Sequence, residues 1–231
     1  MNIKISVIIP CFNEKDTILK TLKKVIQVDP PNKEIIIVDD CSTDGTLEEI
    51  KKIKDDSVKI YYHEKNFGKG RALKTALKNV TGDIVIIQDA DSEYDPKEYS
   101  RLLKPFFETD ADIVYGSRFL GGGDYVRLHF FWHFIANKML TFATNIFTNL
   151  NMTDMETGYK LFKKNVIQSI ELKENSFGIE PEITIKLAKK GYKFYEVPIS
   201  YRGRSYEEGK KIGIKDAFRA IYCILKYKFF N

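Results

Sequence analysis

The sequence predicts an α/β fold in three layers, with helices on both faces of a mostly parallel sheet. Segments with strand-like and helix-like spacing alternate along the first half of the chain, as expected when helices connect parallel strands. The strand-like segments are continuous apolar runs, such as Ile84-Val85-Ile86-Ile87, which is typical of strands buried on both faces. The 231 residues, 43% of them hydrophobic, suffice for one sizeable core, so we expect a single domain over residues 1–231.

The expected elements follow one another without linkers or repeats. Strand-like runs occur at Ile3–Ile9, Glu34–Val38, Val58–Tyr62, the segment that ends at Asp89, and Ala111–Tyr115. Helical spacing or a helix-start signal occurs at Asp16–Val28, Asp44–Lys54, Gly68–Lys78, and from Asp95-Pro96 onward, where proline suits the first turn. The glycine run Gly121-Gly122-Gly123 separates residues 1–120 from the helical, aromatic-rich residues 121–231.

Charge and cysteine content narrow the classes of function. The net charge of +5 is mild and no aromatic RNA-binding motif is present, so we expect no nucleic-acid partner. A phosphorylated substrate or an anionic membrane surface suits the same excess of positive charge. The three cysteines, Cys11, Cys41 and Cys223, are far apart, which indicates free thiols in a reducing compartment. We expect neither a signal peptide nor a transmembrane helix, since no apolar run of about 18 residues occurs.

The most informative motif is Asp89-Ala90-Asp91, at the end of the apolar run. Side chains two residues apart on a strand point the same way, so both carboxylates are expected to face one point at the ligand-binding edge of the sheet. A divalent cation relieves the repulsion between two carboxylates, and Mg²⁺ commonly completes its shell with substrate phosphates. The motif therefore favours an enzyme acting on a nucleoside diphosphate compound, with a solvated turn as the alternative.

Two further loops follow predicted strands. At Asp39-Asp40 a carboxylate can accept hydrogen bonds from a ribose hydroxyl or a base edge, while Ser42–Thr46 suits a turn and a helix cap. The loop Asn66–Ala72 matches neither the P-loop nor the dinucleotide-binding spacing. It is a basic loop at a helix start that either touches the nucleotide or turns the chain.

Together these segments resemble the family 2 glycosyltransferases with the GT-A fold, in particular the dolichol-phosphate mannose synthase and polyprenyl-phosphate glycosyltransferase branch. The resemblance covers nearly the whole chain and rests on motifs in a fixed order: V-I-I-P-C-F-N-E, V-D-D-x-S-x-D-G-T, N-x-G-K-G-x-A, D-A-D, Gly116-Ser117-Arg118, Asp154–Lys160, and Tyr201–Arg204 ahead of Gly209-Lys210-Lys211. It implies a Rossmann-like three-layer domain plus C-terminal amphipathic helices. Residues 1–120 would form the nucleotide-sugar and metal half, and residues 121–231 the acceptor half.

The resemblance also implies the site residues. Those expected to bind the nucleotide-sugar are Pro10, Phe12, Glu14, Asp39, Asp40, Lys69, Asp89 and Ala90. A divalent cation, Mg²⁺ or Mn²⁺, would be held by Asp89, Asp91 and Glu93, and an acceptor phosphate by Arg118, Lys160 and Arg202. The residues expected to carry catalysis are Asp91, Asp154, Arg118, Arg204 and Lys210. Mannose synthases typically have R-x-x-x-x-S-K in the last loop, whereas Gly209 precedes Lys210 here, which leaves the donor open.

The implied reaction is an inverting transfer, in which the acceptor oxygen attacks the anomeric carbon as the nucleoside diphosphate leaves. A phosphate monoester acceptor is already anionic near neutral pH, so it needs positive charge rather than a base. A saccharide or other hydroxyl acceptor needs a base, for which Asp154 is the candidate, with a turn-capping carboxylate as the alternative. A non-catalytic nucleotide-sugar binder is the third hypothesis.

Two segments favour a membrane-facing acceptor. Tyr125–Leu150 combines helical apolar spacing with extra aromatic residues, among them Phe130 and Phe134, and the C-terminal stretch from Ile214 repeats the pattern. We therefore expect a peripheral enzyme at the cytoplasmic, inner face of the cell membrane, taking a polyprenyl or dolichyl phosphate, with room for a membrane-protein partner. Packing on the sheet is the alternative, and His129 and His133 are interpreted as packing or interface residues. Glu180 and Glu182 open a further helix, and Glu180 is the better candidate to face the site.

Overall fold

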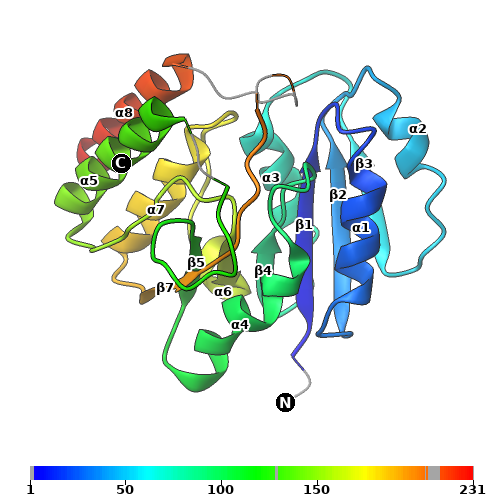
Figure 1. Cartoon of the computed structure of the whole chain (residues 1–231), viewed down its shortest axis with the longest axis horizontal. Coiled ribbons are helices and arrows are strands. Elements are labelled where there is room, and N and C mark those ends of the chain that lie inside the picture. The colour runs from blue at the N-terminus through cyan, green and yellow to red at the C-terminus, as the bar shows by residue number, and fades with distance from the viewer. Residues whose placement is uncertain (1–2, 128–129, 206, 208–213, 231) are drawn as a thin grey trace.

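The computed structural model describes residues 3–127, 130–205, 207 and 214–230, and its centre is a seven-stranded sheet (Figure 1). The strands are β1 (Ile5–Cys11), β2 (Lys33–Asp39), β3 (Val58–Tyr62), β4 (Ile84–Ile87), β5 (Ile113–Ser117), β6 (Lys160–Lys163) and β7 (Phe194–Pro198). Their order is β3-β2-β1-β4-β6-β5-β7, and every pairing is parallel except those of β6 with β4 and β5. The predicted mostly parallel α/β sheet is confirmed.

Helices cover both faces of this sheet. They are α1 (Ile18–Gln27), α2 (Thr46–Ile50), α3 (Lys69–Leu77), α4 (Tyr99–Glu108), preceded by the 3₁₀ turn η1 (Pro96–Glu98), α5 (Phe131–Thr148), α6 (Lys164–Gln168), α7 (Ile179–Lys189) and α8 (Ile214–Phe229). One apolar cluster packs α3, α5, α6, α7 and α8 against the sheet, and a second packs α1, α2 and α4 against it. In Figure 1, α5, α7 and α8 accordingly lie on the opposite side of β1 from α1 and α2.

The two clusters exist because side chains alternate along each buried strand. On β1, Ile8 joins the first cluster whereas Val7 and Ile9 join the second. β2 repeats the pattern, with Ile36 in the first cluster and Ile37 in the second. A strand that is buried on both faces needs apolar side chains at consecutive positions. This is why a continuous apolar run in the sequence predicts such a strand.

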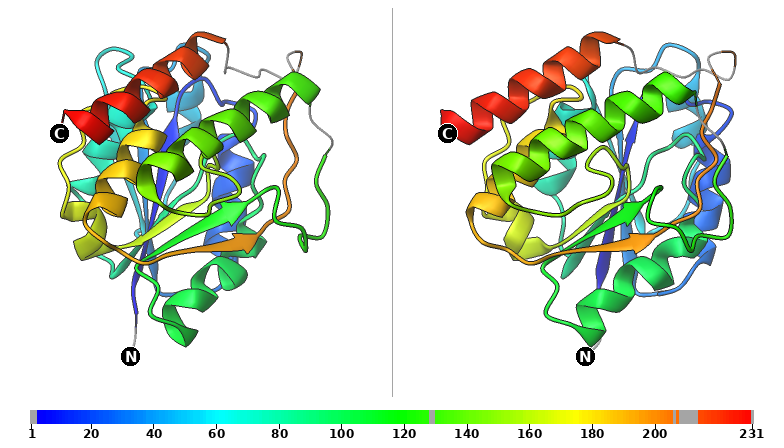
Figure 2. Two further views of the ribbon diagram at one scale, coloured as in Figure 1. Left: turned by 90° about the vertical axis from the view of Figure 1, so that its left-hand side faces the viewer. Right: turned by 60° about the vertical axis from the view of Figure 1, so that its left-hand side comes forward.

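The helices α5 and α8 lie side by side as an outer layer next to α7 (Figure 2). Phe147 of α5 and Phe229 of α8 make an edge-to-face contact at 5.7 Å between ring centroids. Only a few side chains of α5 are buried beneath it, namely Leu140, Thr141 and Thr144. No helix in the described parts of the chain is long and apolar enough to cross a bilayer.

Three element predictions differ from the structure. β4 ends at Ile87, so Asp89 and Asp91 lie on the following turn, where Ser92 takes a left-handed φ of 61°. The prediction that both carboxylates project from one strand face is therefore wrong. α2 is shorter than Asp44–Lys54, since it starts after Gly45, whose φ is 95°. The helix expected from Tyr125 begins only at Phe131, because Val126 is extended and bridges to Tyr201.

Candidate active site

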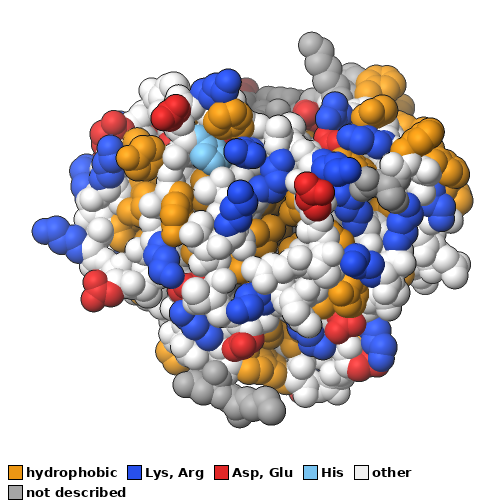
Figure 3. Space-filling model, turned by 180° about the vertical axis from the view of Figure 1, so that it is seen from behind, with side chains coloured by type: hydrophobic (Ala, Val, Ile, Leu, Met, Phe, Trp, Pro, Cys, Tyr) orange, Lys and Arg blue, Asp and Glu red, His pale blue; other side chains and the backbone are white. Residues whose placement is uncertain are grey.

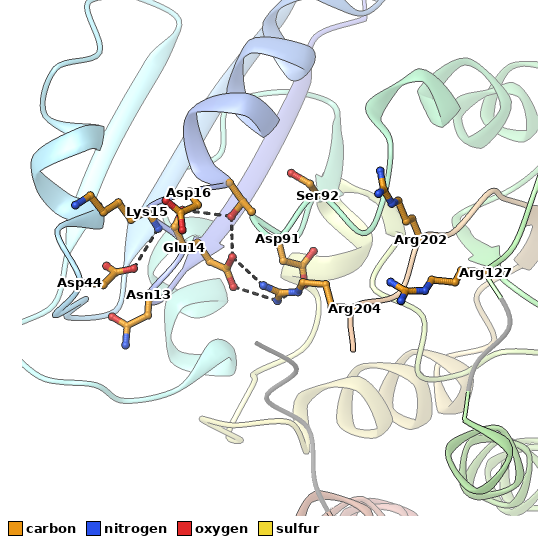
Figure 4. Close-up of a pocket in the computed structure, with 11 residues that line it drawn as sticks. Asn13, Glu14, Lys15, Asp16, Asp44, Asp91, Ser92, Arg127, Arg202 and Arg204 are labelled. Carbon is orange, nitrogen blue, oxygen red and sulfur yellow. Dashed lines mark hydrogen bonds and ion pairs between the residues drawn. The ribbon is translucent and has the colours of Figure 1, made fainter. Parts of the chain in front are cut away.

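The carboxyl ends of β1, β2 and β4 meet at one edge of the sheet, as the ends of parallel strands must. A cavity of about 390 Å³ opens there, lined on one side by Asn13–Thr17 and Asp44 and on the other by Asp91, Ser92, Arg127, Arg202 and Arg204 (Figure 4). The cavity therefore lies between loops of the first half of the chain and an extended segment of the second half.

Arg204 binds the acidic residues at the centre of this cavity (Figure 4). Its Nη1 and Nη2 donate to the two oxygens of Glu14 at 3.1 Å each, and Nη2 also donates to Asp91 Oδ2 at 3.1 Å. The pairing is bidentate on Glu14, which fixes the guanidinium plane as well as its charge. Arg204, from the second half of the chain, is thereby bonded to the loop that follows β1.

Asp91 has more negatively charged neighbours than positively charged ones. Burial, with the neighbouring Glu93 and Asp89 carboxylates, raises its pKa to about 8, although Arg204 opposes this. Such a carboxylate suits a divalent cation, which commonly binds through one or two carboxylates and takes its remaining ligands from water and substrate phosphates. Within residues 3–127, 130–205, 207 and 214–230, no three Asp, Glu, His or Cys side chains are arranged as a metal site by themselves. The donor set thus fits a cation that arrives with a diphosphate.

The other two expected metal ligands have protein partners. Asp89 Oδ1 lies 3.0 Å from Lys69 Nζ, so the two carboxylates of the D-A-D motif have different partners. Glu93 accepts from the Tyr201 hydroxyl at 2.6 Å and from the Arg204 backbone N–H at 2.7 Å. Glu93 therefore fixes the segment that carries Arg204, and its role as a metal ligand stays a prediction.

Asp39 and Asp40 are buried and support the loops around the cavity. Asp39 accepts from the Ser42 backbone N–H at 3.0 Å and from its hydroxyl at 2.5 Å. Asp40 accepts from the backbone N–H groups of Phe67 and Gly68, the latter at 2.6 Å, and lies 2.6 Å from His63 Nδ1. Both carboxylates hold neighbouring loops in place, and their expected contact with base or ribose stays a prediction.

The loop after β1 is attached to the loop after β2. Asn13, with a φ of 52°, donates its backbone N–H to the Ser42 hydroxyl at 2.9 Å, and its side-chain oxygen accepts from the Thr43 backbone at 2.8 Å. The Glu14 backbone N–H donates to Thr46 Oγ1 at 2.9 Å. Pro10 and Phe12, the other residues expected on this side of the nucleotide site, are partly exposed.

Arg118 forms a second guanidinium–carboxylate pair, with Asp154. Nε and Nη2 of Arg118 each donate to Asp154 at 2.7 Å, its backbone N–H donates at 3.1 Å, and Asn137 adds a bond at 3.3 Å. Asp154 has no exposed surface, and although burial opposes this, Arg118 lowers the pKa of its carboxyl. A carboxylate so occupied is a poor base, and its bonds hold the Arg118 guanidinium in one orientation. The general-base role of Asp154 stays a prediction that this geometry does not favour.

The remaining predicted cations differ in position. Arg202 is exposed at the cavity, together with Arg127, whose Nη1 donates to the Gly203 carbonyl at 2.9 Å. Lys160 is 2% exposed, donates to the Thr157 carbonyl and lies 4.9 Å from the Tyr115 ring centroid. This burial does not favour contact with an acceptor phosphate, which stays a prediction. Lys210 and Gly209 lie outside the described residues.

Three contributors to the site were not predicted from the sequence. Tyr94 is buried, accepts from the Gly158 backbone N–H at 2.8 Å, and packs 4.9 Å from the Tyr201 ring. Gly158 is required beside it, because a Cβ there would lie 2.3 Å from Asp89 Oδ2. Arg127 lies within Tyr125–Leu150, the segment expected to face the membrane, but its backbone N–H donates to the Tyr201 carbonyl at 2.9 Å and the residue lines the cavity.

A mostly parallel α/β sheet with acidic and arginine side chains at its carboxyl edge is consistent with a glycosyltransferase, and the model of glycosyl transferase family 2 matches residues 6–171. The chain belongs to this family. It is 28% identical to the undecaprenyl-phosphate mannosyltransferase of Micrococcus luteus over 222 residues, which are 91% of this chain and 88% of that protein. It is 29% identical to the dolichol-phosphate mannosyltransferase of Pyrococcus furiosus over 230 residues, which are 97% of this chain and 64% of that protein.

Solved structures agree on the GT-A fold. Glucosyl-3-phosphoglycerate synthase from Mycobacterium tuberculosis, in complex with Mn²⁺, UDP and phosphoglyceric acid, superposes with a TM-score of 0.74 at 19% identity, covering 100% of this chain and 80% of that one. Mannosyl-3-phosphoglycerate synthase from Rubrobacter xylanophilus gives a TM-score of 0.72 at 20% identity, covering 97% and 72%. The predicted three-layer GT-A domain is thereby confirmed.

Proposed function

We propose that this glycosyltransferase moves a hexose from a nucleotide-sugar to a polyprenyl phosphate, with inversion, at the cytoplasmic face of a membrane. The names of the two mannosyltransferase relatives support a polyprenyl phosphate as acceptor. The observation that carries the proposal is the position of α5. Asn137 on one face of this helix binds Asp154, which holds Arg118, while the opposite face presents apolar side chains to solvent.

On the donor side, Arg204 and the acidic residues around it would hold the diphosphate. Asp91, with Asp89, would hold Mg²⁺ or Mn²⁺, and the cation would supply charge stabilisation for the departing nucleoside diphosphate. Solved neighbours crystallised with Mn²⁺ or Mg²⁺ and UDP support a cation in this fold. Arg204, already fixed by Glu93 through its backbone, adds a preorganised positive charge beside the leaving group.

On the acceptor side, Arg118 would bind the phosphate whose oxygen attacks. Its Nε and Nη2 are committed to Asp154, so the guanidinium is held in one orientation, with Tyr201 below it at 5.1 Å. A phosphate monoester is ionised near neutral pH, since its second pKa is about 6. It therefore needs no base, which agrees with a site whose buried Asp154 is occupied by Arg118.

The lipid part of the acceptor would be met by α5 and α8. Seen from behind, apolar side chains gather at the edge formed by these helices, with Lys and Arg beside them (Figure 3). The large exposed apolar residues here, at 36% to 83% exposure, are Phe130, Phe131, Trp132, Phe134, Met139, Phe142, Ile146, Phe218, Ile221, Tyr222, Leu225, Phe229 and Phe230. We call this set the apolar ridge. An apolar face flanked by basic residues suits a helix lying in the membrane interface.

A transfer assay tests the reaction class. Purified protein would be incubated with Mg²⁺ or Mn²⁺, a short polyprenyl phosphate, and UDP-glucose, UDP-N-acetylglucosamine or GDP-mannose in separate reactions. Labelled sugar in the organic phase with one donor supports the proposal, and the Arg118→Ala variant should then lose that product. Lys104→Ala, which removes an exposed α4 side chain paired with Glu108, is the control. Sugar transfer to a soluble hydroxyl acceptor without lipid product would overturn the polyprenyl phosphate assignment.

A further inference from the structure

A second group of charged side chains adjoins Asp89 and lies between the two arginine pairs of the site. Lys69, the first residue of α3, places its Nζ 3.0 Å from Asp89 Oδ1 and 3.1 Å from Glu180 Oε1, on the first turn of α7. Glu156 precedes β6, and Lys160 lies on it. Neither the diphosphate contacts nor the acceptor contacts proposed above use Glu156 or Glu180.

Two carboxylate oxygens in this group have no hydrogen-bond partner. Glu180 is only 6% exposed, and while its Oε1 binds Lys69, its Oε2 is buried and unpaired. Glu156 Oε1 is also buried and unpaired, although the residue as a whole is partly exposed. Buried polar atoms in folded proteins nearly always have a partner, so two orphan oxygens in one place indicate a bound molecule that supplies hydrogen bonds.

The surroundings of the orphan oxygens indicate what kind of molecule this is. Lys69 connects Glu180 to Asp89 of the donor motif, while Arg118 and Asp154 are close enough to Glu156 to influence its ionisation. The group therefore lies between the expected diphosphate and the expected acceptor phosphate. The transferred sugar must occupy this interval, since its anomeric carbon is bonded first to one phosphate and then to the other.

Sugar hydroxyls also match the hydrogen-bonding capacity of the two acids. Burial and the neighbouring Glu180 raise the pKa of Glu156 to about 8, so near pH 7 its carboxyl keeps a proton and can donate. Glu180 Oε2 offers a hydrogen-bond acceptor, since the same carboxylate pairs with Lys69 through Oε1. A hydroxyl group both donates and accepts, so adjacent hydroxyls on a pyranose ring can satisfy both orphan atoms.

We propose that Glu156 and Glu180 form the subsite for the donor hexose, and that Glu156 determines which hydroxyl pattern the site accepts. The ligand class is an uncharged hexose carried on a nucleoside diphosphate, because the carboxylate of a uronic acid would be repelled by Glu180. The inference rests on the proposed function, since it takes a nucleotide-sugar as donor and an acceptor phosphate at Arg118.

Calorimetry with the full chain and Mn²⁺ tests the subsite without depending on any acceptor. The probes are a nucleoside diphosphate alone and two nucleotide-sugars with the same base and epimeric hexoses, such as UDP-glucose with UDP-galactose or GDP-mannose with GDP-glucose. Glu156→Leu removes the hydrogen-bonding carboxyl group at nearly constant side-chain volume, whereas Glu156→Gln keeps an N–H that can donate a hydrogen bond. Glu108→Gln on the surface of α4 is the matched control.

In Glu156→Leu, the affinity ratio between the two epimeric donors should fall at least about tenfold, while affinity for the nucleoside diphosphate stays within about twofold. Glu156→Gln should keep more of the discrimination than Glu156→Leu. Equal losses for diphosphate and nucleotide-sugars, or unchanged discrimination in both variants, would overturn the subsite. If discrimination falls as expected but no polyprenyl-linked sugar forms in the transfer assay, the subsite stands and the acceptor assignment fails.

Discussion

Asp154 and Asp91 are both acidic residues of the site, and their surroundings give them opposite properties. Asp154 is bonded through both oxygens to Arg118, which lowers the pKa of its carboxyl against the effect of burial. Asp91 lies beside Glu93 and Asp89, and burial together with these charges raises its pKa to about 8. A base needs a free oxygen, and a cation site needs uncompensated negative charge. Asp91 therefore meets the condition for a cation site, whereas Asp154 does not meet the condition for a base.

The Asp154→Ala variant tests whether Asp154 positions Arg118. Removing one partner of a buried ion pair leaves the guanidinium uncompensated, so the free energy of unfolding should fall by about 3–5 kcal/mol. The KM for the acceptor phosphate should rise, because Arg118 loses its fixed orientation. Chemical denaturation and acceptor titration measure the two effects. Asp110→Ala, which breaks the exposed pair with Lys193, should change neither. A variant with normal stability and acceptor KM that lacks the low-pH limb of the rate profile would instead identify Asp154 as a base.

At the scale of elements, Glu174 connects α8 to the loop before α7. Its carboxylate accepts from Arg219 Nε at 3.2 Å, from Lys226 at 2.9 Å and from the Tyr227 hydroxyl at 2.7 Å. Although its burial opposes this, these donors lower the pKa of Glu174 to about 2. The same loop also bonds α7: the Glu171 carbonyl accepts from Lys186, and the Lys173 and Glu174 backbone N–H groups donate to Glu182. This loop therefore supports both α7 and α8.

The Glu174→Gln variant should therefore lose stability in a pH-dependent way. The folded pKa lies below the unfolded value of about 4.3, so the contribution is present above that value and is lost as pH falls toward about 2. The gap in unfolding free energy between wild type and variant should be widest near pH 7 and narrower at pH 3. Urea denaturation at both pH values measures it, with Glu108→Gln as a surface control. A gap that does not change with pH would mean that lost packing, rather than charge, explains the difference.

The apolar ridge on α5 and α8 gives a second prediction at this scale. Phe142 is 67% exposed on α5, and aspartate in its place would put a charge where the lipid interface is expected. Phe142→Asp should reduce sedimentation with anionic vesicles at least about fivefold at low salt, with unchanged affinity for the nucleotide-sugar. Phe107→Asp on α4 provides a matched control, since Phe107 is 57% exposed outside the ridge. Equal vesicle binding by wild type and both variants would remove the ridge from the docking proposal.

Local pattern predicted most elements of the first half, and long-range pairing explains what it missed. β3 spans Val58–Tyr62 as predicted, since turn residues flank a short apolar run. β6 and its antiparallel position between β4 and β5 were not predicted, because strand order depends on contacts distant in sequence. Among site residues, Lys160 illustrates the same limit. Its sequence neighbours do not reveal that a carbonyl and an aromatic ring enclose its ammonium group, while burial lowers its pKa to about 8.

At the scale of the whole molecule, the site joins the two halves of the chain. Arg204 reaches Glu14 and Asp91 across more than a hundred residues of sequence, and Tyr201 binds Glu93 beside it. The Arg204 guanidinium partly neutralises these carboxylates. A bound cation and the diphosphate of the donor would each supply the charge that the other needs at this place. Cation and donor binding should therefore be mutually dependent.

Metal removal and the Asp91→Asn variant test this dependence together. Chelation should abolish transfer, and Mn²⁺ should restore it in wild type but not in Asp91→Asn, because an amide lacks the charge that attracts the cation. Free Mn²⁺, followed by electron paramagnetic resonance, should bind more tightly when a nucleoside diphosphate is present, since phosphate oxygens complete the ligand shell. Asp95→Asn, whose carboxylate pairs with Lys24 outside the cavity, should behave as wild type. Full transfer in the presence of chelator would show that Arg204 and its neighbours stabilise the leaving diphosphate unaided.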